Sequence, residues 1–196
     1  ASTLEEALAV AAGDVVKAGG TYSVHAQYGP QFQVRRLRRL ADGEYDPATL
    51  VPVSPVPLAE LRDRLHALVQ SIADPNLHAL LDRALDPDTE PGATFAVVPA
   101  AVTHHHAYLS GLLEHSIIVA EVASSVAASF PTVKRDLAVT GALLHDVGKT
   151  LSYSADLLAP GLTDAGRLHG EIVLGHDILR GLLAELPDFP AELGSQ

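Results

Sequence analysis

The chain has 196 residues, of which 47% are hydrophobic, and a formal net charge of −11. This length and apolar content suit one domain, or one domain with an appendage, that buries a core of its own. The acidic balance excludes indiscriminate nucleic-acid binding, which depends on Lys and Arg, but it allows a nucleic-acid substrate that is held locally.

The sequence contains no cysteine. This excludes disulfides, thiolate nucleophiles and cysteine-based zinc sites, so a bound metal would need His, Asp or Glu ligands. No apolar run approaches the length of a membrane span. The first residues, ASTLEEALAVAAG, carry acids where a signal peptide has a basic region. We therefore expect a cytoplasmic protein with no membrane partner.

Residues 1–41 predict a small β element. β-Branched and aromatic residues flank a turn at Tyr28, and Phe32 and Val34 alternate with polar neighbours, as in a half-buried strand. An isolated hairpin is barely stable, so we expect this one to pack against another part of the protein. Residues 42–57 contain four prolines and predict a linker.

Residues 58–196 predict a helical domain, so the expected fold class is mainly α with a preceding β hairpin. Leucines recur at helical spacing from Leu58 onward. Asp74 followed by Pro75 is typical of an N-cap and first position, here of a short helix that ends near Leu85. Three further helices are expected at about residues 107–129, 134–147 and 164–185.

Each of these last three helices has an ionisable group on its apolar stripe. His115 lies on the first stripe, His145 and Asp146 stand side by side on the second, and Glu171 falls inside the third. A lone histidine on an apolar face is usually a satisfied core residue. Three such helices in succession, with no Lys or Arg on the stripes, instead indicate a divalent cation that keeps carboxylates ionised and imidazoles neutral. The GKT that follows does not complete a phosphate loop, because Leu143 stands where that motif needs Gly.

Three segments carry these residues: HHAYLSGLLEHSIIVAEVA, GALLHDVGKT and GRLHGEIVLGHDIL. Together they resemble the HD-domain metal-dependent phosphohydrolases, most closely the YhaM-type 3′–5′ exoribonucleases. The resemblance implies a helical HD domain preceded by an OB-fold for single strands, of which the N-terminal β element would be the last part. It also implies His115 as the first metal ligand, His145 and Asp146 as the central pair, and Lys149 as a group that neutralises phosphate.

The sequence departs from that family pattern in three places. Glu171 stands where the family has a histidine; a carboxylate can still ligate manganese or iron, and His169 and His176 are alternatives. The closing Asp ligand of the family would follow Gln196, so we expect the HD domain to be C-terminally incomplete in this sequence. The residues before Asp14 are too few for a whole five-stranded OB-fold.

These observations predict metal-dependent phosphodiester hydrolysis, specifically 3′–5′ trimming of single-stranded RNA or DNA. Asp146 and Lys149 are the expected catalytic residues. The metal ligands would be His115, His145, Asp146 and Glu171, with Mn²⁺ favoured over Fe, Ni, Co, Mg or Zn. The expected substrate-binding residues are His105, His106, Tyr28, Arg35 and Arg36.

Two alternatives fit the sequence. The acidic net charge favours an HD phosphohydrolase that acts on a nucleotide or another small phosphate ester. Glu171 and the missing closing Asp favour a non-catalytic domain for nucleic-acid binding or assembly. A homo-oligomer is compatible with all three interpretations.

Overall fold

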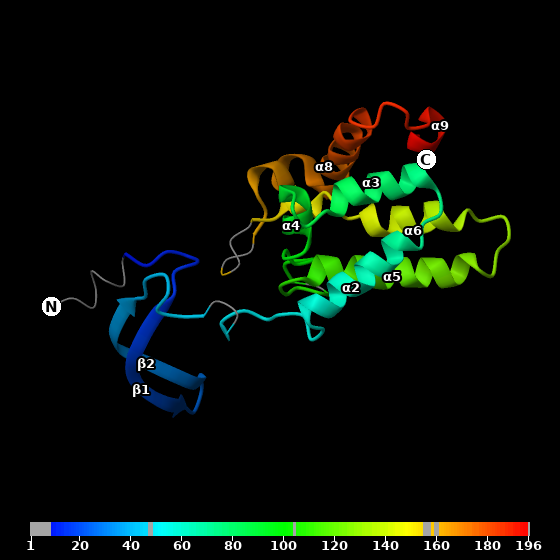
Figure 1. Ribbon diagram of the computed structural model, residues 1–196. Coiled ribbons are helices and arrows are strands. Elements are labelled where there is room, and N and C mark those ends of the chain that lie inside the picture. The colour runs from blue at the N-terminus through cyan, green and yellow to red at the C-terminus, as the bar shows by residue number, and fades with distance from the viewer. Residues whose placement is uncertain (1–8, 47–48, 104, 155–157, 159–160, 196) are drawn as a thin grey trace. The chain divides into compact units, whose positions relative to one another are not determined.

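The computed structural model describes residues 9–46, 49–103, 105–154, 158 and 161–195. The chain divides into two compact units, Ala1–Leu50 and Val51–Gln196 (Figure 1). The first contains a β hairpin and the second is helical. This confirms the predicted fold class, a mainly helical chain with a small β element before the helices.

The hairpin pairs β1, Val16–His25, with β2, Gly29–Arg39, in antiparallel register. Gly29 has a φ of +73°, a left-handed conformation that glycine adopts at little steric cost. A register shift just before Gly20 leaves Arg35 as the extra residue of a β-bulge. Such bulges strengthen the local twist and re-aim side chains.

The register gives the two faces of the hairpin different chemistry. Directly paired residues lie on the same face, so one face gathers apolar side chains, among them Tyr22, Phe32 and Val34. Phe32 and Val34 are 49% and 48% exposed within this unit, and the expected packing of the hairpin against another part of the protein stays a prediction. The opposite face carries Lys17 and Arg36.

The arginines of β2 differ in their partners. Arg35 and Arg36 are exposed and form no ion pair with any residue that the structure describes. The two arginines nearest the end of the strand pair with acids of the same unit, Arg38 with Glu44 at 2.9 Å and Arg39 with Asp14 at 2.6 Å.

The second unit packs its helices around one apolar core. Its largest fully buried side chains include Leu61, Leu81, Phe95, Leu112 and Ile117. None of the helices in the described part of the chain is both long and apolar enough to cross a membrane. The helices are α2 Leu58–Gln70, α3 Pro75–Leu85, α4 Glu90–Phe95, α5 Gly111–Ala127, α6 Arg135–Leu144, α7 Lys149–Ser152, α8 Asp164–Ala184 and α9 Ala191–Gly194.

Helix α3 begins as the sequence predicted. The Asp74 carboxylate accepts hydrogen bonds from the backbone N–H groups of Asn76 and Leu77, at 2.9 and 3.2 Å, and Pro75 occupies the first helical position. The cap satisfies two N–H groups that have no partner within the helix, and proline sacrifices no helical hydrogen bond there.

The expected apolar stripes were wrong for parts of α5 and α8. Val122 and Val126 of α5 are 57% and 51% exposed, and the buried face of that helix is instead centred on Ile117. In α8, Gly170 has a φ of +71° and a ψ of 163°, which breaks the helical path. A single helical phase therefore does not run through α8, and Ile172, which follows Glu171, is 72% exposed.

Candidate metal centre

Helices α5 and α6 lie side by side and bring three of the predicted ligands to one point (Figure 1). His115 comes from the second turn of α5, and His145 and Asp146 follow the last residue of α6. The Nε2 atoms of the two histidines are 3.2 Å apart. Oδ2 of Asp146 lies 3.4 Å from Nε2 of His115 and 3.2 Å from Nε2 of His145. Two imidazole nitrogens and one carboxylate oxygen thus converge.

The His145 ring is held with one nitrogen free for a ligand. Its Nδ1 lies 2.8 Å from the backbone oxygen of Ala142. A carbonyl oxygen only accepts, so Nδ1 carries the proton and donates it. In the neutral ring the lone pair is then on Nε2, the atom that faces His115 and Asp146. Metal-binding histidines are commonly oriented by this kind of outer hydrogen bond.

Asp146 is buried, and it is ionised. Burial raises the pKa of the Asp146 carboxyl, but a hydrogen bond from His145, which Nε2 donates only when the ring is doubly protonated, and one from Lys149 outweigh burial and lower that pKa to about 2. The hydrogen bond with Asp146 raises the pKa of His145 against the effect of burial. Burial lowers the pKa of His115, although the Asp146 charge opposes it. The single negative charge of Asp146 therefore interacts with His115, His145 and Lys149.

Lys149 supplies a positive charge at the site, where the family resemblance placed it as a group that neutralises phosphate. Its Nζ lies 2.7 Å from Oδ2 of Asp146, and its side chain is only 14% exposed. The stripes defined by helical spacing carry no Lys or Arg, and Lys149 neutralises Asp146 from outside them. Backbone hydrogen bonds from Lys149 to Asp146 and from Thr150 to Val147 wind the chain into α7 directly after α6, which brings Lys149 back to the carboxylate.

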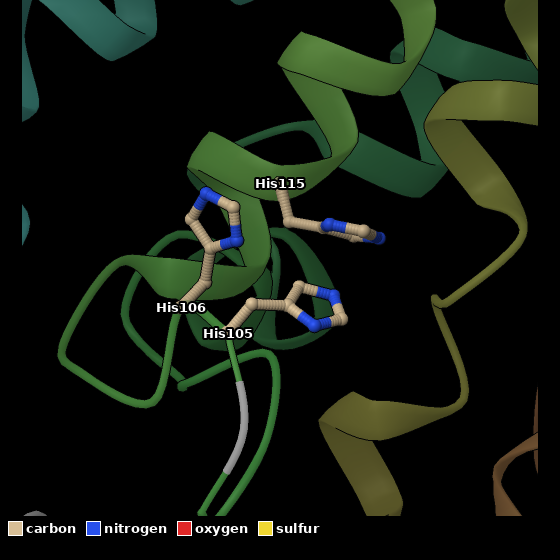
Figure 2. A group of neighbouring side chains, drawn as sticks. All are labelled: His105, His106 and His115. Carbon is tan, nitrogen blue, oxygen red and sulfur yellow. The ribbon is translucent and has the colours of Figure 1, made fainter.

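His105 and His106 reach His115 from the loop before α5. Ring centroids lie 5.1 Å apart for His105 and His115 and 5.5 Å apart for His106 and His115. Figure 2 shows the three rings grouped beside the start of α5. Gly111 permits this approach, because a Cβ there would lie 2.0 Å from the backbone oxygen of His106.

Glu114 is a buried carboxylate of the site that sequence reasoning missed. It is 6% exposed, and its Oε2 accepts hydrogen bonds from Ser54 at 2.7 Å and from Tyr108 at 2.8 Å. These bonds fasten the His105–Tyr108 loop to the helix that carries His115. The sequence signal for the burial of Glu114 was its position next to His115, among apolar residues of the same helix.

We expect Glu114→Gln to destabilise the protein by about 1–3 kcal/mol, because the new amide N–H₂ would be buried without acceptors. The change should also be visible at Tyr108. Burial and the hydrogen bond to Glu114 raise the pKa of Tyr108 from 10.0 to about 12. The neutral phenol is the favoured form, so its contribution to stability is complete below pH 10 and is lost as the pH rises towards 12.

An alkaline titration of the tyrosine absorbance, with Tyr108→Phe to identify the signal, measures this pKa. Glu114→Gln should lower the pKa of Tyr108 towards its ordinary value. Glu121→Gln is the matched control on the same helix, because Glu121 forms a half-exposed ion pair with Arg64; such pairs contribute roughly 0–1 kcal/mol. A Tyr108 pKa unchanged by Glu114→Gln would show that the contact does not persist in solution.

Glu171 does not join the cluster. Two groups of donor atoms within 4.8 Å of one another are found among the described residues, and neither includes Glu171, His169 or His176. The backbone of Glu171 is nevertheless adjacent to the site, because a Cβ on Gly148 would lie 1.9 Å from its carbonyl oxygen. The role of Glu171 as a ligand stays a prediction.

A cavity of about 560 Å³ borders the cluster on its His145 side. Its lining includes His145, Gly141, Ile172 and His176. Gly141 is exposed there, with no atom within 4 Å of the position of a Cβ. Gly141 therefore does not serve a close approach between helices.

The remaining predicted substrate contacts belong to the hairpin unit. Tyr28 lies in the turn, where its ring is 4.8 Å from that of His25, and Arg35 and Arg36 lie on β2. All three are exposed. They are described within that unit only, and their role in substrate binding stays a prediction.

Comparisons with known proteins give a consistent result. Residues 112–190 match the HD domain family. The chain is similar to proteins named 3′-5′ exoribonuclease YhaM: it is 28% identical to that of Bacillus pumilus over 94% of this chain and 55% of the relative. It is 32% identical to that of Listeria innocua over 72% of this chain and 44% of the relative. It is 30% identical to that of Bacillus subtilis over 81% of this chain and 49% of the relative. The chain spans about half the length of these relatives, and no solved structure matches it.

Proposed function

Because residues 112–190 match the HD domain family, we propose that this chain is a metal-dependent phosphodiesterase that shortens single-stranded RNA from its 3′ end. The single observation that carries the proposal is the convergence of His115, His145 and Asp146 within 3.4 Å of one another. The relatives named 3′-5′ exoribonuclease YhaM support the choice of RNA and of polarity.

The residues present fit a divalent cation. Two imidazole nitrogens and an ionised carboxylate are the donors that manganese, iron and zinc accept, and the Ala142 carbonyl already directs the Nε2 lone pair of His145 to the common point. We propose Mn²⁺, because the set has a hard oxygen ligand and no thiolate. A bound cation would polarise a phosphoryl oxygen and lower the pKa of a water molecule at the site.

The chain's own residues would orient the attacking water and stabilise the charge on the phosphate. Asp146 would ligate the cation and accept a hydrogen bond from the attacking water. Lys149 lies 2.7 Å from Asp146, close enough to turn its ammonium towards the phosphate and offset the negative charge that develops there. The cavity on the His145 side offers room for the terminal nucleotide.

Arg35 and Arg36 would guide the upstream phosphates of the strand. They are the arginines of β2 that no described acid pairs with, so their charges are free for phosphate. Tyr28 is exposed in the turn of the same hairpin and could stack against a base. A basic hairpin within a chain of net charge −11 would confine strand binding to one place.

A 5′-labelled single-stranded RNA, incubated with the chain and Mn²⁺, tests the proposal. It should shorten stepwise from its 3′ end, and it should stay intact when a chelator is added. If the purified protein retains no Mn, Fe, Ni or Zn and releases no nucleotide in any of them, the non-catalytic alternative replaces this proposal.

The salt dependence of RNA binding separates the exonuclease from an enzyme of small phosphate esters, which the acidic net charge favours. Each phosphate neutralised on a single strand contributes a slope of about −0.7 to the logarithmic plot of affinity against salt. Arg36→Gln should weaken binding and flatten the plot by about that amount, whereas Arg62→Gln, an exposed arginine on α2, should not. A flat plot for the unmodified chain, with turnover of free nucleotides, would favour the small-ester enzyme.

A further inference from the structure

Three histidines form a second set of donors beside the proposed catalytic site. Ring nitrogens of His105, His106 and His115 all lie within 4.8 Å of one another. The centroids of the His105 and His106 rings are 5.5 Å apart and meet edge to face. His105 and His106 come from the loop and His115 from α5, and Figure 2 shows that the three side chains gather on one side of that helix.

His106 is the member of the set whose environment favours a bound ligand. Its Nδ1 is buried and has no hydrogen-bond partner among the described residues. A buried polar nitrogen without a partner is costly, and such atoms are rare in folded proteins. A metal ion that accepts the lone pair of this nitrogen would remove the cost.

The backbone holds His106 at this place in a strained conformation. Its φ is +55°, which is uncommon for a residue other than glycine. The conformation is fixed from both sides, because the His106 carbonyl accepts a hydrogen bond from the backbone N–H of Ala100 at 3.1 Å and packs against Gly111. Strain of this kind persists where the surroundings enforce it, often at ligand sites.

The donor chemistry differs from that of the first site. The set of His105, His106 and His115 has three imidazoles and no carboxylate. Imidazole ligands suit zinc, cobalt and nickel, whereas manganese and magnesium prefer oxygen. Three histidines with an open fourth position for water are also a known arrangement for zinc.

We propose that His105, His106 and His115 bind a divalent cation of the zinc class at a position distinct from that of His115, His145 and Asp146. A neutral imidazole has one lone pair, so His115 can serve one of the two positions at a time. The two positions therefore compete for His115, and a zinc-class ion on the three histidines would withdraw that ligand from the other position. The inference shares only His115 with the proposed function and does not require RNA hydrolysis.

Cobalt(II) titration, followed by visible absorbance and by calorimetry, tests this directly, because the intensity of the cobalt bands reports the number of ligands. Asp146→Asn removes the carboxylate of the first position and should still bind one Co²⁺ per chain, with the strong absorbance of a four-coordinate nitrogen-rich site. Adding His105→Ala in that background should weaken Co²⁺ binding at least tenfold. Adding His66→Ala, a histidine of α2, should leave it unchanged.

His105 is exposed, so its removal is the variant least apt to disturb folding, and His106→Ala is the second test of the same set. His145→Ala serves as an alternative background, since it removes a ligand of the first position and keeps the ion pair between Lys149 and Asp146. Loss of all Co²⁺ binding in both backgrounds, or equal binding with and without His105, would overturn the proposal. Failure of the RNA assay with Mn²⁺ would overturn the proposed function and leave this result standing.

Discussion

Replacing His145 with alanine is expected to abolish RNA hydrolysis and to remove most of the stabilisation that Mn²⁺ gives the unmodified protein. His145 provides the Nε2 donor that lies 3.2 Å from both His115 and Asp146. A ligand at 100 times its dissociation constant stabilises the folded state by about 2.7 kcal/mol. In a chain of this size that corresponds to a rise in the melting temperature of roughly 5–10 °C. Thermal unfolding with Mn²⁺ and with chelator measures the difference.

The comparison between the two buffers separates ligation from packing. If His145 serves only to fill space, His145→Ala lowers the melting temperature equally with Mn²⁺ and with chelator, and that outcome contradicts the proposed role. His66→Ala is the matched control, because His66 is an exposed histidine of α2. It should keep both the RNA hydrolysis and the full response to Mn²⁺.

The grouping of His115 with His145 and Asp146 was accessible from sequence because it depends on helical spacing and on a segment resemblance that spans both helices. Helices α5 and α6 form near the expected positions and lie side by side, so His115 meets the pair that follows α6, although Val122 and Val126 are exposed. What spacing cannot supply is the return of the chain after α6. Lys149 reaches Asp146 through the short turn of α7, which periodicity does not reveal.

Helix α8 could not be predicted from helical spacing in this way. Its stripe was assigned on the assumption of one continuous helical phase, and Gly170 interrupts that phase with a φ of +71°. Residues on either side of Gly170 therefore follow different phases, so Ile172 is exposed and the argument that placed Glu171 on the buried stripe no longer applies. The glycine inside the helical pattern was the sequence signal for this break, because glycine readily adopts such a conformation.

Glu114 was overlooked for a different reason. Carboxylates are rarely buried unless they are paired, so an acid next to His115 was passed over. Its partners, Ser54 and Tyr108, lie outside the helix, and Ser54 is sixty positions away in sequence. Contacts across such separations depend on the tertiary fold and leave no local pattern.

Gly148→Ala is expected to lower the free energy of unfolding by about 3 kcal/mol, the upper part of the usual range for overpacking. The backbone conformation is ordinary, with a φ of −63°, so the effect is steric. A Cβ at this position would lie 1.9 Å from the backbone oxygen of Glu171 and 2.4 Å from the backbone nitrogen of Gly175. Both neighbours are backbone atoms of α8, and they can yield only if α7 and α8 move apart.

That movement would also disturb the metal centre, because α7 carries Lys149, which bonds to Asp146. Chemical denaturation measures the loss of stability, and calorimetry with Mn²⁺ should show weaker binding in the same variant. Gly141→Ala is the matched control: Gly141 is an exposed position inside α6, with nothing within 4 Å of the added carbon. There alanine should stabilise the helix by up to about 1 kcal/mol. Equal stability of the two variants would mean that α7 and α8 do not approach as closely as the structure shows.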